Sequence, residues 1–234
     1  IKVLEHYPVE SADELENKTH IVLAWLLGKS TNLRERLRAD LLASILLENS
    51  ASPLRHALET SGLGTAPSPL CGLEDSMREM SFVCGMEGSN PEHADALEQL
   101  VRTVLNNIAE QGAPQEDVEA ALHQLEIDQR EIGGDSYPYG LQLILNGLSS
   151  AVHYANPTEV LDLDHVLAEL HEQIKTPGFV QGLVREFLLQ NEHYVRLVMA
   201  PNAQITRRHD LALAEKLQRI TQGLSVAQKE QIKK

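Results

Sequence analysis

Aromatic residues are scarce in this chain, at 4% of 234 residues with a single tryptophan among them. Leucine, valine, isoleucine and methionine must therefore fill the interior, and the 42% hydrophobic content is enough for one large core or two small ones. Apolar runs are also short. The longest, from Ile21 to Leu27, falls well below the roughly 20 residues that a membrane-spanning helix needs. We therefore expect a globular protein with no membrane partner.

Basic residues are in the minority. The chain has 20 lysines and arginines against 34 aspartates and glutamates, which gives a formal net charge of −14. Nucleic acids and anionic membrane surfaces bind proteins through clustered positive charge, so this balance argues against both as partners. It permits basic peptide ligands, although solubility is the simpler use of an acidic surface.

Cysteine is nearly absent, with only Cys71 and Cys84 present. Both fall in a stretch that we predict to be one extended strand, which would hold their Cα atoms about 40 Å apart. A disulfide needs Cα atoms within about 7 Å, so we expect two unreactive free thiols. Free thiols are typical of a reducing compartment such as the cytoplasm.

Alternating apolar residues predict three strands, at residues 19–28, 72–88 and 193–200. Residues 122–131 fit a further strand as well as a helix. Elsewhere apolar residues recur at helical spacing, and helices are predicted to begin near residues 32, 53, 91, 114, 138, 164, 179 and 210. The order predicts an α+β fold of two layers, a mostly antiparallel sheet with helices packed on one face.

This pattern divides the chain into three parts. Residues 1–18 are polar and broken at Pro8, so we expect a lead-in segment. Residues 19–205 hold every predicted strand and form one α+β domain. Residues 206–234 are a helix that ends in a tail rich in lysine, glutamate and glutamine. Ile1 is not an initiator residue, so we expect the chain to be part of a longer polypeptide.

Motifs for zinc catalysis are missing. The inverted motif His-x-x-Glu-His places two histidines on one helical face with a glutamate as general base. Three Glu-His pairs occur, at residues 5–6, 92–93 and 192–193, but Lys2, Ser89 and Leu189 stand where the first histidine is needed. The forward motif begins at residues 171–172 and fails at Lys175. We therefore predict no catalytic residues and no metal ligands in this chain.

A looser cluster remains, because helical spacing can bring His165, Glu169 and Glu172 to one face. A solvated polar face opposite the apolar stripe of that helix is the simpler interpretation, and an adventitious metal site is the alternative. Cys84 has no nearby cation to lower its pKa, which favours a core thiol over a nucleophile.

Other candidate sites are weak. The residues 62–64, Gly-Leu-Gly, lack the lysine of a phosphate-binding loop and run into prolines, and no Gly-x-Ser-x-Gly elbow occurs, so no cofactor site is predicted. The alternating residues Met80, Phe82 and Met86 favour core packing, with peptide contact as the alternative. Arg207 and Arg208 are interpreted as a surface pair.

Residues 52–88 run as a short helix, a Ser-Gly-Leu-Gly turn at 61–64, a Pro-Ser-Pro break at 67–69 and a long strand. This order resembles the presequence-protease branch of the pitrilysin/insulinase family of zinc peptidases. Residues 125–131 (LEIDQRE), 137–141 (YPYGL), 187–195 (FLLQNEHYV) and 210–229 are similar to further stretches of that branch, although Ile127 stands where the branch often has phenylalanine. The resemblance covers residues 19–230.

The resemblance implies the second, non-catalytic domain of the first half of such an enzyme, with the family's metallohydrolase fold but without its metal site. Residues 206–234 would begin the helical linker between the halves. Zinc would belong to the parent enzyme, and the partners would be the zinc domain, the second half and unstructured peptides. We expect a bacterial source. A free-standing peptide-binding or adaptor protein of the same fold and an independent metalloenzyme using His165 are the alternatives.

Overall fold

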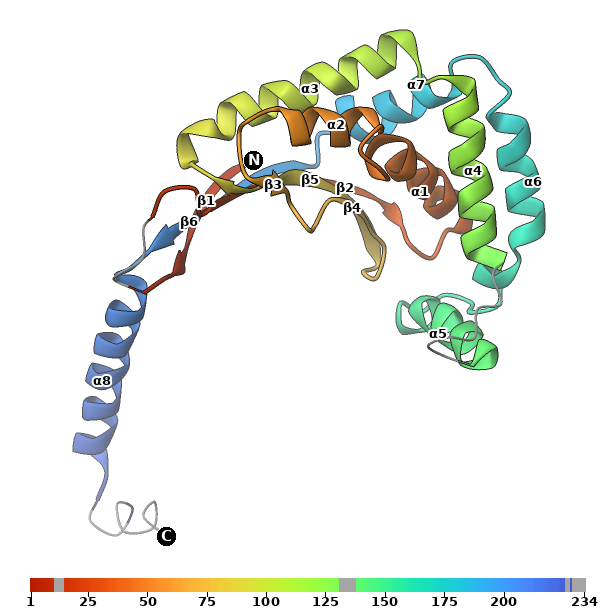
Figure 1. Ribbon diagram of the computed structural model, residues 1–234. Coiled ribbons are helices and arrows are strands. Elements are labelled where there is room, and N and C mark those ends of the chain that lie inside the picture. Colours follow the sequence, from red (N-terminus) through yellow and green to blue (C-terminus); the bar gives the residue numbers. More distant parts are fainter. Residues whose placement is uncertain (11–14, 131–137, 226–227, 229–234) are drawn as a thin grey trace.

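The protein folds as one mixed sheet covered on one face by helices, as a computed structural model shows for residues 1–10, 15–130, 138–225 and 228 (Figure 1). The strands lie in the order β1 (Lys2–Pro8), β6 (Tyr194–Asn202), β2 (Thr19–Lys29), β5 (Glu79–Ser89) and β3 (Ala66–Pro67), and β4 (Gly72–Glu74) also pairs with β5. Strand β1 runs parallel to β6, and the other pairs are antiparallel. The predicted α+β class is confirmed.

The helices gather on one side of the sheet and at one end of it. They are α1 (Leu33–Leu47), α2 (Pro53–Thr60), α3 (Ala94–Gln111), α4 (Gln115–Arg130), α6 (Leu163–Gln173) and α7 (Phe179–Val184). Short turns of helix at Pro91–His93, Glu159–Leu161 and Arg185–Leu189 join them. Asn32 caps α1, because its side chain accepts hydrogen bonds from the backbone N–H groups of Arg34 and Glu35. Gly112, at φ +81°, ends α3.

The core lies between the sheet and these helices. One face of β2 and β5 supplies Ile21, Leu23, Trp25, Met80, Phe82, Cys84 and Met86, all 1% exposed or less. The helices pack leucines against this face, among them Leu37, Leu41 and Leu54, which are fully buried. With few aromatic residues, leucine fills most of this interface, as the composition predicts.

The polar lead-in predicted for residues 1–18 is wrong for its first half. Lys2–Pro8 forms the edge strand β1, in register from Lys2 opposite Arg196 to Pro8 opposite Asn202. Most of this strand is exposed, so it lacks the apolar alternation that marks a buried strand. Its partner lies at the far end of the chain, where local patterns carry no signal. The proposed domain boundaries stay a prediction.

The single long strand predicted for residues 72–88 is also wrong, because the chain turns back within it. Strand β4 and strand β5 form an antiparallel hairpin, with Gly72 opposite Val83 and Glu74 opposite Ser81. The Glu74 side chain accepts a hydrogen bond from Ser76 N at 2.9 Å and stabilises the turn. The predicted separation of about 40 Å between the two cysteines fails for the same reason.

The strand alternative for residues 122–131 is wrong within the described residues, because α4 continues through Arg130. Two further helices were predicted and are present: α5 (Tyr139–Val152) and α8, which begins at Ile205 rather than near 210 and ends at Gly223. Both stand away from the main body (Figure 1), and α8 has no buried residue. Most of the predicted polar tail after Ser225 lies outside the described residues. No helix in the described part of the chain is long and apolar enough to cross a membrane.

Candidate functional site

The loose cluster on α6 is organised by an arginine from another helix. The Arg34 guanidinium at the start of α1 contacts Glu169 through Nε at 2.7 Å and Nη2 at 2.8 Å, and its Nη2 lies 3.1 Å from Nε2 of His165. Glu172 pairs instead with Lys175 at 2.6 Å. The hydrogen bond from Arg34 holds the pKa of Glu169 below its usual range. This geometry favours a solvated ion cluster over a metal site.

Across the described ranges, no group of three or more histidine, cysteine, aspartate or glutamate side chains is placed to hold a metal ion. Met80, Phe82 and Met86 face the helices and are buried, which confirms core packing rather than peptide contact. Cys84 is fully buried beside them. Arg207 and Arg208 lie on the exposed α8. None of these residues forms a catalytic arrangement.

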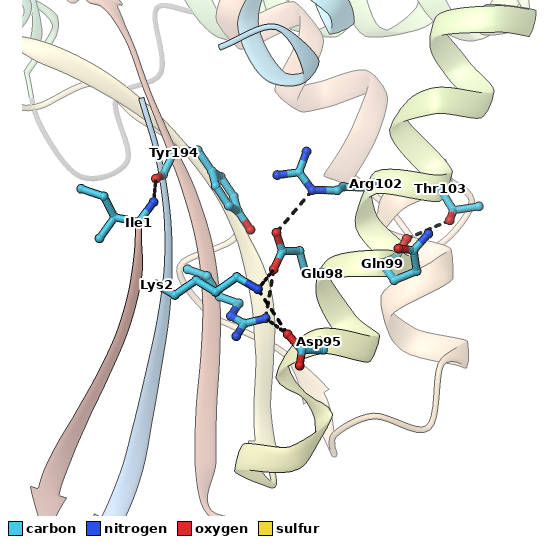
Figure 2. A network of polar contacts seen from close by, with 9 residues as sticks. Ile1, Lys2, Asp95, Glu98, Gln99, Arg102, Thr103 and Tyr194 are labelled. Atoms are coloured by element: carbon cyan, nitrogen blue, oxygen red, sulfur yellow. Dashed lines mark hydrogen bonds and ion pairs between the residues drawn. The ribbon is translucent and has the colours of Figure 1, made fainter. Parts of the chain in front are cut away.

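A polar network that the sequence did not indicate fastens α3 to the edge of the sheet (Figure 2). Glu98 of α3 accepts from Arg196 of β6 at 2.9 Å and from Arg102 at 3.4 Å, and lies 3.4 Å from the Lys2 ammonium of β1. Asp95 also contacts Lys2 and Arg196. The network therefore joins the edge strand β1 and its neighbour β6 to one helix.

The inner members of the network are shielded from water. The Glu98 and Arg196 side chains are 15% and 11% exposed, whereas Asp95 is 83% exposed. Burial on its own raises the pKa of Glu98, but the charge of Lys2 and the hydrogen bond from Arg102 outweigh burial, and the pKa of Glu98 ends below its usual range. Glu98 is therefore charged at neutral pH and compensates the buried guanidinium.

Tyr194 of β6 adds aromatic contacts to this network. The guanidinium of Arg102 lies 5.0 Å from the Tyr194 ring centroid, and the centroid of the Trp25 ring lies 4.9 Å from it. Burial, followed by the charge of Glu98, raises the pKa of Tyr194 far above its ordinary value. The phenol therefore stays protonated, which suits a structural role and not proton transfer.

The side of the sheet that faces away from the helices is the larger candidate surface, which we call the open face. The register places alternate residues of the three central strands on it. They are Val22, Ala24 and Leu26 of β2, Val83 of β5, and Val195, Leu197 and Met199 of β6. Leu26 is 47% exposed, and all of the others except Val22 are partly exposed.

Helices α5 and α8 expose apolar side chains as well. On α5, Ile144 is 65% exposed and Leu148 is 49% exposed. On α8, Leu213, Leu217 and Ile220 recur along one face and are about half exposed. Apolar surface spread over a sheet face and two projecting helices is typical of a domain that contacts other polypeptide.

Comparison with known proteins gives the family. Residues 2–125 match the family model described as "Peptidase M16 inactive domain", and the chain belongs to this family. It is 30% identical over 222 residues to a mitochondrial presequence protease of Xenopus laevis and 28% identical over 229 residues to presequence protease 1 of Arabidopsis thaliana. These alignments cover 94% and 96% of the chain but 21% of each relative. The chain thus spans about a fifth of the length of these relatives.

Solved structures agree on the fold. The inactive peptidase domain of a putative zinc protease from Bordetella parapertussis superposes with a TM-score of 0.59 at 15% identity, over 83% of this chain and 95% of that one. A protease from Helicobacter pylori gives 0.63 at 12% identity, over 86% of this chain and 44% of that one. The resemblance to the presequence-protease branch is confirmed, and the chain is the inactive domain of a peptidase family.

Proposed function

We propose that this chain is a structural domain of a zinc-dependent oligopeptidase, in which it orients the zinc domain and forms part of the wall of a peptide-degrading chamber. The open face carries the proposal. One face of the sheet is covered by helices, and the other is apolar and partly exposed. Such a sheet can line one side of a chamber with its open face. The relatives are about five times longer than this chain, which leaves room for a separate catalytic domain.

The partners in this proposal are other parts of the same polypeptide. The zinc domain and the second half of the parent would cover the projecting helices, with residues 206–234 as the start of the linker between the halves. Zinc would be bound by the parent and not by this chain. Unstructured peptides are the proposed substrates, because a closed chamber excludes folded proteins. A reducing compartment and a bacterial source stay predictions.

The first experiment measures hydrolysis of a quenched fluorogenic peptide by the purified chain with added zinc, with and without a chelator. We expect no chelator-sensitive cleavage. Sustained zinc-dependent turnover that is lost in His165→Ala would overturn the proposal, because this chain would then carry the catalytic site itself. Lys175→Ala, in the turn just after α6, is the matched control, since it removes an exposed side chain that pairs with Glu172 and not with His165.

The chamber-wall role is tested in the full-length parent with one substitution on each face of the layer. Leu197→Asp places a charge on the open face, and Ala96→Asp places the same charge on the exposed side of α3. We expect both isolated chains to fold, and the parent's peptidase activity to fall about tenfold or more only with Leu197→Asp. Equal activity of the two parents would contradict a role of the open face in the chamber.

A free-standing peptide-binding protein is the second candidate, and one observation favours it. Among the described residues, strand β1 lies at the edge of the sheet and pairs on one side, with β6, and edge strands bind extended peptides by strand addition. Binding of an unstructured peptide to the isolated chain, measured by fluorescence anisotropy and abolished by Leu4→Pro in the edge strand, would support this candidate. The first proposal instead expects no measurable affinity outside the parent.

A further inference from the structure

The hairpin of β4 and β5 brings the only two cysteines of the chain together. Gly72 lies opposite Val83, so continuing the antiparallel register by one residue sets Cys71 opposite Cys84. Residues opposite each other in an antiparallel pair have Cα atoms about 4.5–5.5 Å apart, and a disulfide spans about 4.4–6.8 Å. The backbone spacing therefore suits a bridge.

The side chains point to the same side of the sheet. Cys84 belongs to the buried core, and Cys71 packs against that core from the neighbouring segment. The Cys71 thiol lies 3.6 Å from the carbonyl oxygen of Gly85, the residue that follows Cys84. The Cys71 thiol thus lies beside the strand that carries Cys84, on the face covered by helices.

The backbone before Cys71 is held in place. Ser68 N donates to the carbonyl of Gly85 at 2.8 Å, and Cys71 N donates to the carbonyl of Ser68 at 3.0 Å. These bonds tie residues 68–71 to β5 beside Cys84. A pair fixed in this way does not need a large backbone movement to form a bond.

We propose that Cys71 and Cys84 are a modification site, a thiol pair that peroxide converts into a disulfide between β5 and the residue that directly precedes β4. The half-buried Cys71 thiolate attacks the peroxide oxygen, so the O–O bond breaks and a Cys71 sulfenic acid forms. The Cys84 sulfur then attacks the Cys71 sulfur, the S–S bond forms and the sulfenic oxygen leaves as water. In total two thiols lose two hydrogens and one hydrogen peroxide becomes two waters.

The surroundings set the pH dependence of this reaction. Burial raises the pKa of both thiols, that of the fully enclosed Cys84 more strongly, and the Cys71 sulfur adds to the effect on Cys84. Only the thiolate is reactive, so oxidation is slow at neutral pH and accelerates as the pH rises. Arg55 of α2 is the charged group that acts on the Cys71 thiol, and its positive charge partly opposes the effect of burial on the pKa of Cys71.

Trypsin provides a direct test, because it cleaves after Arg55, Arg78 and Arg102 and so places the two cysteines on different peptides. After treatment of the folded chain with hydrogen peroxide, we expect peptides 56–78 and 79–102 to appear as one disulfide-linked species in non-reduced mass spectra. Reduction should separate them. Recovery of both peptides with free or singly oxidised thiols, over the whole range of peroxide, would overturn the proposal.

Two variants separate the bridge from unrelated oxidation. Cys71→Ser and Cys84→Ala each leave one thiol, so neither forms the linked species, and one suffices if the other fails to fold. The bridge closes a loop of about 14 residues, so oxidation should raise the thermal midpoint of the unmodified chain by about 6–12 °C and leave that of either variant unchanged. An equal shift in a variant would show that the stabilisation comes from elsewhere.

Discussion

Strand β2 carries side chains of similar size on its two faces and in opposite surroundings. Leu23 points into the helices and is fully buried, whereas Leu26 lies on the open face and is 47% exposed. Leu23→Ala should lower the free energy of unfolding by about 2–5 kcal/mol, because it leaves a cavity in the core. Leu26→Ala should cost less than about 1 kcal/mol. Urea unfolding measures both, and equal losses would mean that the open face is covered in the isolated chain.

Asp40 of α1 is the residue whose titration affects stability near neutral pH. Burial, followed by the charge of Asp75, raises the pKa of Asp40 to about 6, and Arg36 only partly opposes this. The folded state then binds the proton more tightly than the unfolded state does. Stability from this group is present below about pH 4 and is lost as the pH rises through about 6.

Replacement of Asp40 by asparagine removes that loss. Asp40→Asn should raise the free energy of unfolding by about 1–2 kcal/mol at pH 7 and change it little at pH 4. The measurement is urea unfolding of both chains at each pH. A difference that is the same at the two pH values would assign the effect to packing and not to protonation.

At the scale of secondary-structure elements, the network on α3 holds the edge strand β1 and its neighbour β6 through one shielded carboxylate. Glu98→Ala leaves Arg196, which is 11% exposed, without its most shielded partner, and we expect a loss of about 2–4 kcal/mol. Asp95→Ala removes a carboxylate that is 83% exposed, from the same helix and the same two cations, and should change stability little. Thermal and urea unfolding compare the two. Equal effects would mean that the network is solvated.

Local patterns predicted most elements but not their long-range partners. The helices and the buried strands β2, β5 and β6 follow from apolar spacing, because each buries one face. Strand β1 is not predicted from the sequence, because it is an exposed edge strand whose partner β6 lies about 190 residues away in the chain. The hairpin turn at residues 75–78 is not predicted because it contains neither glycine nor proline, the strongest turn signals, so nothing divides the run from Gly72 to Gly88.

At the candidate site too, the sequence reveals features that depend on neighbouring residues and not those that depend on distant ones. The loss of the zinc motif is visible in the sequence, since it depends on neighbouring residues. The Lys2, Glu98 and Arg196 network and the Cys71–Cys84 juxtaposition depend on sheet order and register. Register between distant segments cannot be obtained from one sequence without knowing which strands pair.

At the scale of the whole molecule, the apolar stripe of α8 has no partner within the described residues. We expect the isolated chain to self-associate through such surfaces at high concentration, which light scattering detects as a mass above that of the monomer. The double variant Leu217→Lys with Ile220→Lys should reduce the mass. Gln218→Lys with Gln222→Lys adds the same charge to the polar side and should not. A strictly monomeric unmodified chain would contradict the expectation.

The parallel pairing of β1 with β6 also sets the order of events during synthesis. The first strand leaves the ribosome long before residues 194–202 exist, and at about 5–20 residues per second the delay is about 10–40 s. Until β6 arrives, β2 has a bare edge and β1 has no partner at all. The sheet therefore closes only when β6 is made, which leaves an interval in which the nascent chain exposes the unpaired edge of β2 to pairing with other chains.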